Sequence, residues 1–413
     1  MQLQKTKSGF IIFSFLLLAA LSSTSCGHHL LRRLLSRNNV GRTTPLTLSP
    51  TQTTSLFPTN GWPGSPVVGV RVLVNKYGGR VSWSPQGPIA YSLDDHIVSG
   101  TRYADIYTSS ASGSNPRCLT CTSNQIAHLS NDIPLWAPNG NFIIFQSEDP
   151  SLGYVPPQLA QGGAGFDNNL WAATPDGKSF YQLTHISRGD AILHPQFSRN
   201  GQELAWAGYD RGAGTFTRQW DIHIARFQID PSGRPYLSEE KVFRPGISDR
   251  STFYETHGFT PNGELIFSSN MNSPYENSCK ACALGIWEWY PASQQSPVLL
   301  TPNTSSWNEH ASMTPDGKHI AWITSQGEPF TPASNWGLTL RTDWWLMNAN
   351  GTGKKQITFF NSPSSQTSSS NLRVICADSS WNPSGTELVG TVDVIQGDSS
   401  VSKIVILTFA NAE

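Results

Sequence analysis

The stretch from Glu309 to Phe360, EHASMTPDGKHIAWITSQGEPFTPASNWGLTLRTDWWLMNANGTGKKQITFF, contains the pattern on which the fold depends. HASM leads into the turn TPDG, KHIAWITS alternates as a strand does, TDWWLMNA is a third strand, and KKQITFF is a fourth. A unit of four short strands with one apolar face is not stable alone, so it must stack on neighbouring units. The stretch therefore predicts one unit of a repeated all-β structure.

Looser copies of this unit recur along the chain past residue 78. Each copy has a large apolar residue, a tight turn and a glycine, as in WSPQG (83–87), WAPNG (136–140), FSRNG (197–201), FTPNG (259–263), MTPDG (313–317) and WNPSG (381–385). The apolar residue ends an inner strand, and glycine takes the strained corner of the turn. A period of about 50–70 residues with four strands per unit predicts a six-bladed β-propeller.

The repeat also resembles a known family. The series Phe/Trp-Ser-Pro-Asp-Gly-Lys, an apolar strand, Asp-Ile-Trp and Leu-Thr is similar to the propeller repeat of TolB and its relatives, over roughly residues 78–409. The resemblance implies a TolB-like propeller, which we place at residues 63–413. In the sixth unit the chain reaches Glu413 after a third strand, KIVILTF. We expect the alternating strand Val67–Asn75 to complete that last blade, because an open blade would expose a strand edge.

The first 62 residues have a different composition. Residues 1–26 resemble an export signal, with two lysines, an apolar run from Phe10 to Leu21 and small residues before Cys26. Cys26 resembles the lipidated cysteine of a bacterial lipoprotein; ordinary cleavage nearby is the alternative. We expect an exported protein, in the periplasm or at the cell surface, attached to the membrane only through such an anchor. Residues 27–62, a basic patch and a Thr/Ser/Pro-rich tract, are predicted to be a flexible tether.

Composition narrows the class of partner. The chain of 413 residues is 14% charged and contains 35 Gly, 28 Pro and 14 Trp, which suits a turn-rich all-β protein. Its net charge of −1 gives no basic footprint for nucleic acid. The chain has no Gly-x-Ser-x-Gly motif, so a serine peptidase of the prolyl-oligopeptidase type is excluded. We expect a monomer.

Four of the cysteines form two Cys-x-x-Cys pairs. Cys118 and Cys121 lie on the predicted fourth strand of the first blade, and Cys279 and Cys282 lie in a loop of the fourth blade. The spacing within each pair fits a four-thiolate zinc site, but blades one and four face each other across a six-bladed ring. We therefore favour local disulfides, which export permits. Cys376 is expected to be a buried thiol.

Polar residues precede the inner strands and form the candidate site. They are Asp132, His194, Glu255, His257, Glu309, His310 and Asp378. Because inner strands line the channel of a propeller, these side chains should converge, and His194, His257 and His310 could hold a divalent metal there. His257 lies two residues before the aromatic residue or Met of its repeat, whereas His194, His310 and Asp378 lie three before it. This argues against a regular site because neighbouring strand residues point to opposite sides. The alternative is that these side chains satisfy backbone groups.

The loops on the same side are long and aromatic. Four of their residues are further ligand-binding candidates: Tyr209, Arg211, Trp336 and Arg341. Aromatic faces stack on sugar rings, while the hydroxyls of the sugar accept hydrogen bonds from arginines. The alternative is that the aromatic rings pack under their own loops.

Two functions remain open. The first is a binding module without catalysis that holds a protein or a glycan on its loop-rich face. The second is a metal-dependent lyase acting on acidic oligosaccharides. It rests on a resemblance to oligogalacturonate lyase, which has TolB-like blades and a histidine-ligated metal. That resemblance would make the three histidines the metal ligands and His310 and Arg211 candidate catalytic groups. Propellers host many functions, so the fold does not decide; we favour the binding module.

Overall fold

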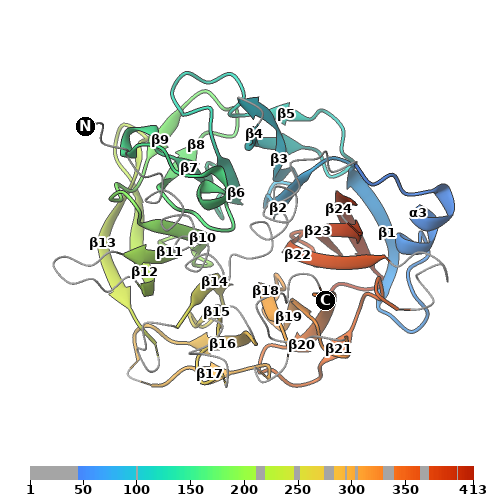
Figure 1. Cartoon of the computed structure of the whole chain (residues 1–413). Coiled ribbons are helices and arrows are strands. Elements are labelled where there is room, and N and C mark those ends of the chain that lie inside the picture. The colour runs from blue at the N-terminus through green and yellow to red at the C-terminus, as the bar shows by residue number, and fades with distance from the viewer. Residues whose placement is uncertain are drawn as a thin grey trace, which may run out of the picture.

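A computed structural model describes residues 45–98, 101–210, 219–245, 252–273, 283–293, 295–302, 306–328, 339–362, 372–397 and 399–413. Its strands form six antiparallel sheets of four strands each, arranged as a ring of blades (Figure 1). The six-bladed all-β propeller that the repeats and the resemblance to TolB predict is therefore confirmed. No helix in this part of the chain is long and apolar enough to cross a membrane.

The strands of each blade follow one another outward from the ring's axis. The first blade contains β2 (Gly78–Trp83), β3 (Ile89–Val98), β4 (Thr101–Ser109) and β5 (Arg117–Cys118); the second, β6 (Asn131–Trp136), β7 (Ile143–Glu148), β8 (Asn168–Ala173) and β9 (Phe180–Gln182); the third, β10 (Ala191–Phe197), β11 (Glu203–Asp210), β12 (Gln219–Ile229) and β13 (Pro235–Phe243). The fourth contains β14 (Tyr254–Phe259), β15 (Leu265–Ser269), β16 (Gly285–Trp289) and β17 (Val298–Leu299); the fifth, β18 (Asn308–Met313), β19 (His319–Thr324), β20 (Asp343–Asn348) and β21 (Lys355–Gln356).

The sixth blade joins the two ends of the described chain. It contains β22 (Arg373–Trp381), β23 (Glu387–Gln396) and β24 (Ser399–Phe409), with β1 (Val67–Val74) as its outer strand. β1 pairs antiparallel with β24, from Val67 opposite Phe409 to Val74 opposite Ile404. The predicted closure of the ring by this N-terminal strand is confirmed.

A leucine–threonine clasp fastens the short outer strands. In the first blade the Leu119 N–H donates to the carbonyl of Ile106, whose own N–H donates to Thr120 Oγ1. The hydroxyl of Thr120 donates in turn to Asp105 Oδ1 at 2.5 Å. Equivalent threonines recur at Thr184, Thr301 and Thr358. The Leu-Thr element of the repeat is thus explained by the hydrogen bonds that it makes.

The segment just before β1 differs from the prediction. Residues 45–62 were predicted to belong to the flexible tether, yet they include the helix α3 (Pro50–Leu56), which begins with a capping box between Ser49 and Gln52. Leu56 and Phe57 are buried, and the Trp62 ring meets the Phe360 ring of the fifth blade edge-on at 5.0 Å. The part packed on the propeller therefore begins before residue 63, because a few apolar residues in a polar tract are enough to anchor it. Two other short helices are η1 (Pro150–Leu152) and α4 (Pro157–Ala160).

Candidate functional site

Every inner strand contains a register shift of the kind that a β-bulge produces. The register shifts fall between Gly79 and Val81, Asp132 and Leu135, Leu193 and Gln196, Thr256 and Gly258, Glu309 and Ser312, and Cys376 and Ser379. A bulge inserts residues that have no partner on the next strand and redirects their side chains. The residues inside these bulges include Arg80, Ile133, His194, His257, His310 and Asp378, which all line one cavity on the axis.

The backbone of several bulges is strained. Arg80, His194 and His310 have φ values of 57°, 48° and 51°, in the left-handed region that residues with a Cβ rarely adopt. Each such residue costs about 1–2 kcal/mol. Strain of this kind persists where the surrounding structure enforces it, and it gathers at functional sites.

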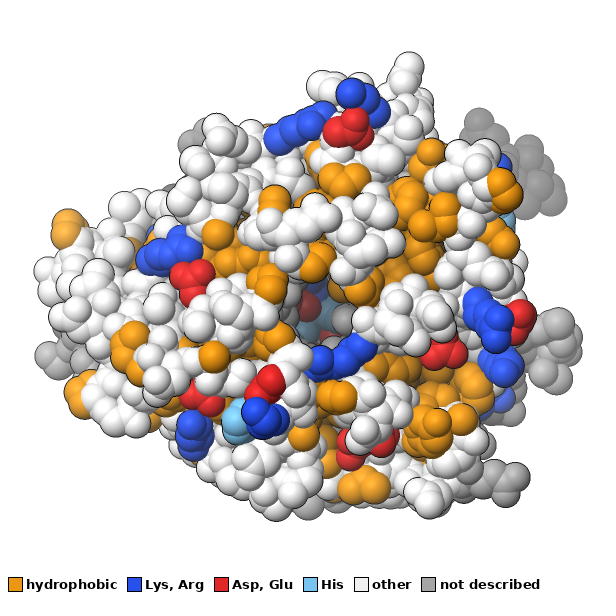
Figure 2. Space-filling model, turned by 180° about the vertical axis from the view of Figure 1, so that it is seen from behind, with side chains coloured by type: hydrophobic (Ala, Val, Ile, Leu, Met, Phe, Trp, Pro, Cys, Tyr) orange, Lys and Arg blue, Asp and Glu red, His pale blue; other side chains and the backbone are white. Residues whose placement is uncertain are grey.

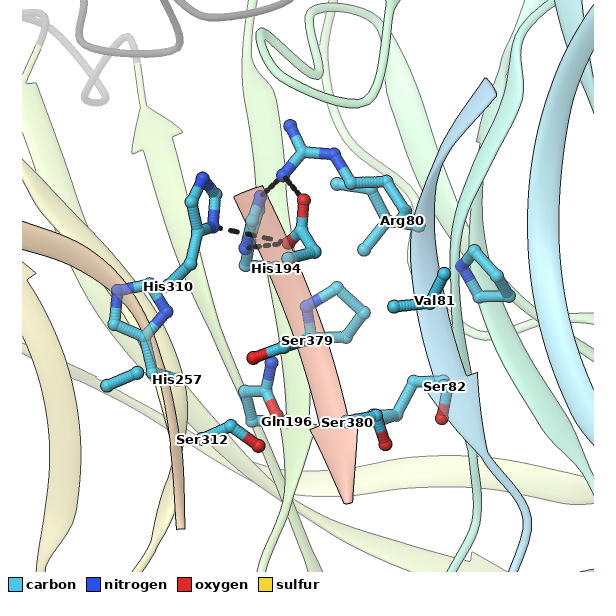
Figure 3. Close-up of a pocket in the computed structure, with 16 residues that line it drawn as sticks. Arg80, Val81, Ser82, His194, Gln196, His257, His310, Ser312, Ser379 and Ser380 are labelled. Atoms are coloured by element: carbon cyan, nitrogen blue, oxygen red, sulfur yellow. Dashed lines mark hydrogen bonds and ion pairs between the residues drawn. The ribbon is translucent and has the colours of Figure 1, made fainter. Parts of the chain in front are cut away.

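The bulges bring three histidines and a carboxylate together. One nitrogen each of His194, His257 and His310 and one oxygen of Glu255 lie within 4.8 Å of one another. All four residues are at most 7% exposed. Figure 3 shows the three histidine rings converging from neighbouring blades, with Arg80 approaching from the other side. The offset of His257 therefore does not keep it out of the cluster, since the bulge breaks the alternation of the strand.

Glu255 makes ion-pair contacts with two of these rings. Its Oε1 lies 3.0 Å from Nδ1 of His194 and 3.6 Å from Nδ1 of His310. Glu255 Oε1 and His310 Nδ1 are buried and have no hydrogen-bond partner among the described residues. Buried polar atoms are normally paired, so atoms left like this point to a missing ligand.

Arg80 and Asp378 close the cluster from the first and sixth blades. Nη1 of Arg80 lies 2.5 Å from Asp378 Oδ2 and 2.9 Å from Nε2 of His194. Because a guanidinium only donates, Nε2 of His194 must accept. Asp378 Oδ1 lies 3.2 Å from Nδ1 of His310, so this carboxylate links the arginine to the histidines.

The electrostatics of the cluster favour ionised carboxylates at two positions. Burial opposes ionisation of Glu255, but the facing His194 and His310 outweigh it and lower the pKa of its carboxyl below its usual range. Burial likewise opposes ionisation of Asp378, yet Arg80 and His310 hold its pKa well below that range. Burial lowers the pKa of His257 to about 3, which keeps it neutral. Two ionised carboxylates thus lie beside a guanidinium and the imidazole rings in a buried place, where charges have to be paired.

Glu309 behaves in the opposite way to Glu255. Burial, reinforced by the charge of Glu255, raises the pKa of Glu309 well above its usual range. Its Oε2 accepts from the Trp307 indole at 3.0 Å, while its Oε1 has no hydrogen-bond partner in the part of the chain that the structure describes. Two neighbouring carboxyls with pKa values moved apart are a frequent feature of acid–base sites.

The remaining candidates lie elsewhere. Asp132 accepts hydrogen bonds from the N–H groups of Ile133 and Gly162 and so supports its own bulge. Tyr209 packs against the Phe166 and Trp220 rings at 5.6 and 5.3 Å, as the packing alternative expects. Arg341 donates to the carbonyl of Leu372. Arg211, Trp336, Cys26, Cys279 and Cys282 lie outside the described residues.

Arg80 is not among the site residues that the sequence predicts. It stands three residues before Trp83, the same offset that His194, His310 and Asp378 have in their repeats. Aligning the six repeats on that position would have found it. Histidines and carboxylates alone do not indicate the cation that pairs with them.

The cavity itself is small. Its volume is about 110 Å³, and its walls continue from the histidines to Ser82, Gln196, Ser312 and Ser380. Figure 2 shows the molecule from behind, with acidic and histidine atoms at the bottom of a central hollow. Sites for whole organic ligands usually measure roughly 300–1,000 Å³. This cavity therefore suits an ion with a few waters, or one small group of a larger ligand.

The structure describes three cysteines, two of which, Cys118 and Cys121, lie on the outer side of the first blade. Cys118 and Cys121 are joined by a disulfide, and Cys376 is a buried free thiol. The expected pairing within Cys118–Cys121 is thus present in the structure, far from the histidine cluster in the fold.

Comparisons with known proteins extend no further than the fold. No protein-family profile and no curated protein matches the chain. Among solved structures, a putative TolB from Agrobacterium tumefaciens is 12% identical, over 70% of this chain and 83% of its own, with a TM-score of 0.43. An oligogalacturonate lyase from Vibrio parahaemolyticus is 8% identical, over 89% and 98%, with a TM-score of 0.47. An oligogalacturonate lyase in complex with manganese has the same identity and coverage and a TM-score of 0.42. Such distant likenesses say nothing of this chain's activity.

Proposed function

We propose that this protein is an exported binding module whose channel holds one divalent transition-metal ion, and that the ion binds an anionic group of the ligand. The observation that carries the proposal is the meeting of His194, Glu255, His257 and His310, whose donor atoms lie within 4.8 Å of one another. Imidazole nitrogens with one carboxylate oxygen suit zinc, manganese, iron or nickel. Export is expected from residues 1–26 and forms part of the proposal.

The protonation state of His257 fits a metal ligand. The Ser268 hydroxyl donates to the carbonyl of Asn308 at 3.3 Å, so its oxygen accepts from Nε2 of His257, 2.6 Å away. Nδ1 of this neutral ring then carries a free lone pair. Fixing a ligand's tautomer through its second nitrogen is typical of metal sites.

The other ligands fit with one rearrangement. Glu255 Oε1 and His310 Nδ1 are already free of hydrogen bonds among the described residues. Two donor atoms that share a tetrahedral or octahedral ion lie roughly 3 Å apart, given metal–ligand bonds of about 2.0–2.2 Å. The 3.0 and 3.6 Å separations around Glu255 match that spacing. His194 would have to release Arg80 from Nε2 or lose the proton on Nδ1.

A second candidate is the metal-dependent lyase acting on acidic oligosaccharides. It is favoured by the pair Glu255 and Glu309, whose carboxyl pKa values move in opposite directions. A bound ion would supply charge that neutralises a uronate carboxylate. The buried, protonated Glu309 could then donate a proton and the ionised Glu255 could accept one. We favour the binding module, because a cavity of about 110 Å³ suits an ion and one small group of a ligand, and no described residue requires catalysis.

Elemental analysis of the purified full chain tests the metal. We expect about one divalent ion per chain in the wild type, none in the double variant His194→Ala/His310→Ala, and a full complement in the control His185→Ala, whose side chain is exposed. An ion content that is near zero in the wild type, or equal in both variants, would contradict the proposal.

Incubation of the metal-loaded protein with oligogalacturonate separates the two candidate functions. Formation of an unsaturated product supports the lyase, and binding without turnover supports the binding module.

A further inference from the structure

A second group of potential metal ligands lies on the first blade, away from the channel. A carboxylate oxygen of Asp105 and the sulfur atoms of Cys118 and Cys121 lie within 4.8 Å of one another. His96 comes from the neighbouring strand β3, and its Nδ1 lies 3.5 Å from Asp105 Oδ2. β4, β5 and the turn after β5 thus bring the Asp105 oxygen and the two sulfur atoms together, and His96 on β3 lies next to Asp105, outside the group within 4.8 Å.

The His96 ring has a nitrogen that is not used in a hydrogen bond. Nδ1 of His96 is buried and makes no hydrogen bond within the described residues. Its distance from Asp105 Oδ2 is close to the roughly 3.3 Å that separates two donors on one tetrahedral zinc ion with bonds of 2.0–2.1 Å. Asp105 uses only Oδ1 for the threonine clasp, so Oδ2 remains available on the side of His96.

The backbone of the cysteine pair is also suited to a thiolate. The Cys121 N–H donates to Cys118 Sγ at 3.1 Å, and the Tyr107 hydroxyl lies 3.4 Å from Cys121 Sγ. The Cys121 N–H can donate to a sulfur that carries negative charge, whereas the Tyr107 hydroxyl donates to Asp95 Oδ2 at 2.7 Å. Cys-x-x-Cys is moreover a common spacing of two zinc ligands. Both cysteines are half-buried, so a reductant and an ion can reach them.

We propose that the first blade contains a thiol-dependent zinc site, formed by Cys118, Cys121, Asp105 and His96 once the disulfide is reduced. A dithiol reductant supplies two electrons and two protons: the S–S bond breaks, two thiols form, and the reductant becomes a disulfide. Zn²⁺ then binds both sulfurs as thiolates and releases two protons to solvent. The oxidised pair cannot serve as ligands, because a disulfide sulfur has no thiolate charge. The site therefore binds its ion only under reducing conditions.

In the reduced protein, a zinc ion at this site would link Cys118 and Cys121 in place of the disulfide. The disulfide joins the two residues that flank the clasp residues Leu119 and Thr120. In the second blade the flanking pair is Gln182 and His185, which meet through a side-chain contact of 3.1 Å. Zinc on the reduced pair would hold the same two positions together. The outer strand of the first blade would stay fastened in both redox states.

Cobalt spectroscopy on the full chain tests this site separately from the channel. Co²⁺ bound by thiolates gives sulfur-to-metal charge-transfer absorption, which the histidines and carboxylates of the channel cannot produce. The variant Cys279→Ser/Cys282→Ser serves as background, because it removes the other Cys-x-x-Cys pair. With reductant we expect about one equivalent of Co²⁺ with this absorption, displaced by Zn²⁺; without reductant we expect none. The result is independent of whether the channel binds a metal.

Three further variants on that background decide the ligand set. Cys118→Ser/Cys121→Ser should abolish the absorption, and Asp105→Asn and His96→Ala should each weaken Co²⁺ binding by at least about tenfold. Asp105→Asn should keep the fold, because blade two has Asn169 in the same place, where its Oδ1 accepts from Thr184. The proposal is overturned if the reduced protein shows no charge-transfer absorption, if the cysteine variant retains it, or if neither Asp105→Asn nor His96→Ala changes the affinity.

Discussion

The channel residues owe their positions to bulges rather than to strand alternation. On a regular strand, His257 would point away from the side chains that stand three residues before the other large apolar residues. The bulge between Thr256 and Gly258 leaves His257 as the unpaired residue and turns it to the axis. A bulge depends on the pairing of two strands, so its place cannot be derived from the sequence of one. This is why the sequence predicts that the side chains converge on the channel but does not predict that His257 joins the other two histidines.

Burial of His257 predicts a dependence of stability on pH. Burial lowers the pKa of His257 to about 3, against about 6.5 for an ordinary histidine. Between these values the unfolded chain binds a proton that the folded protein does not, so stability is lost as the pH falls from 6.5 toward 3. From pH 7 to pH 5 the metal-free wild type should lose about 2 kcal/mol more than His257→Gln, which can still bond Ser268. Urea unfolding in the presence of a chelator measures the difference.

An exposed histidine provides the matched control for this prediction. His185→Gln should follow the wild-type pH dependence, since the His185 ring is exposed. If His257→Gln also follows the wild type, His257 is protonated in the folded protein. The ring would then be unable to act as a metal ligand near pH 6.

The segment before β1 is more ordered than its composition predicts, because part of it packs on the propeller. The Thr/Ser/Pro-rich tract has the composition of a linker, and averaged composition hides four apolar side chains, Leu46, Leu48, Leu56 and Phe57, that pack on the core. What fixes them is the fifth blade, with Phe359 and Phe360 as partners of the Trp62 ring. Contacts between residues 300 positions apart are not visible in local composition.

The packing of this segment predicts a loss of stability on truncating its tryptophan. Trp62→Ala should lower the free energy of unfolding by about 3–5 kcal/mol, because it removes a buried aromatic ring from the Phe359–Phe360 pair. Thr51→Ala, in the exposed part of helix α3, should change it by less than about 0.5 kcal/mol. Urea titration of both variants measures this. If both variants change the free energy of unfolding by the same small amount, residues 45–62 contribute no packing and belong to the tether as predicted.

The number of blades and the closure of the ring could be predicted from the sequence because the propeller is repetitive. Six copies of one turn and strand pattern determine the number of blades, and a unit with three strands of its own requires a fourth from elsewhere. The strand Val67–Asn75 alternates, precedes the first repeat and has no other partner in the repeats, which made it the natural candidate. Closure could therefore be predicted, whereas the chemistry in the channel depends on single residues that differ from blade to blade.

Closure makes β1 the point on which the stability of the ring depends. In the other five blades the four strands follow one another along the chain, whereas β1 precedes the first blade and joins the sixth blade by pairing with β24. Val70, opposite Leu407, is 3% exposed, while Val68 on the same strand is 44% exposed. Val70→Asp buries an unpaired carboxylate, so it should lower the free energy of unfolding by about 4 kcal/mol or more.

The two valines therefore form a matched pair that tests closure. Val68→Asp adds the same charge to the same strand on its exposed face and should cost less than about 1 kcal/mol. Because the blades are continuous with one another around the ring, Val70→Asp should lower the melting temperature of the whole protein in one transition. A separate early transition, with the remaining blades melting at the wild-type temperature, would show that the ring stands without its N-terminal strand.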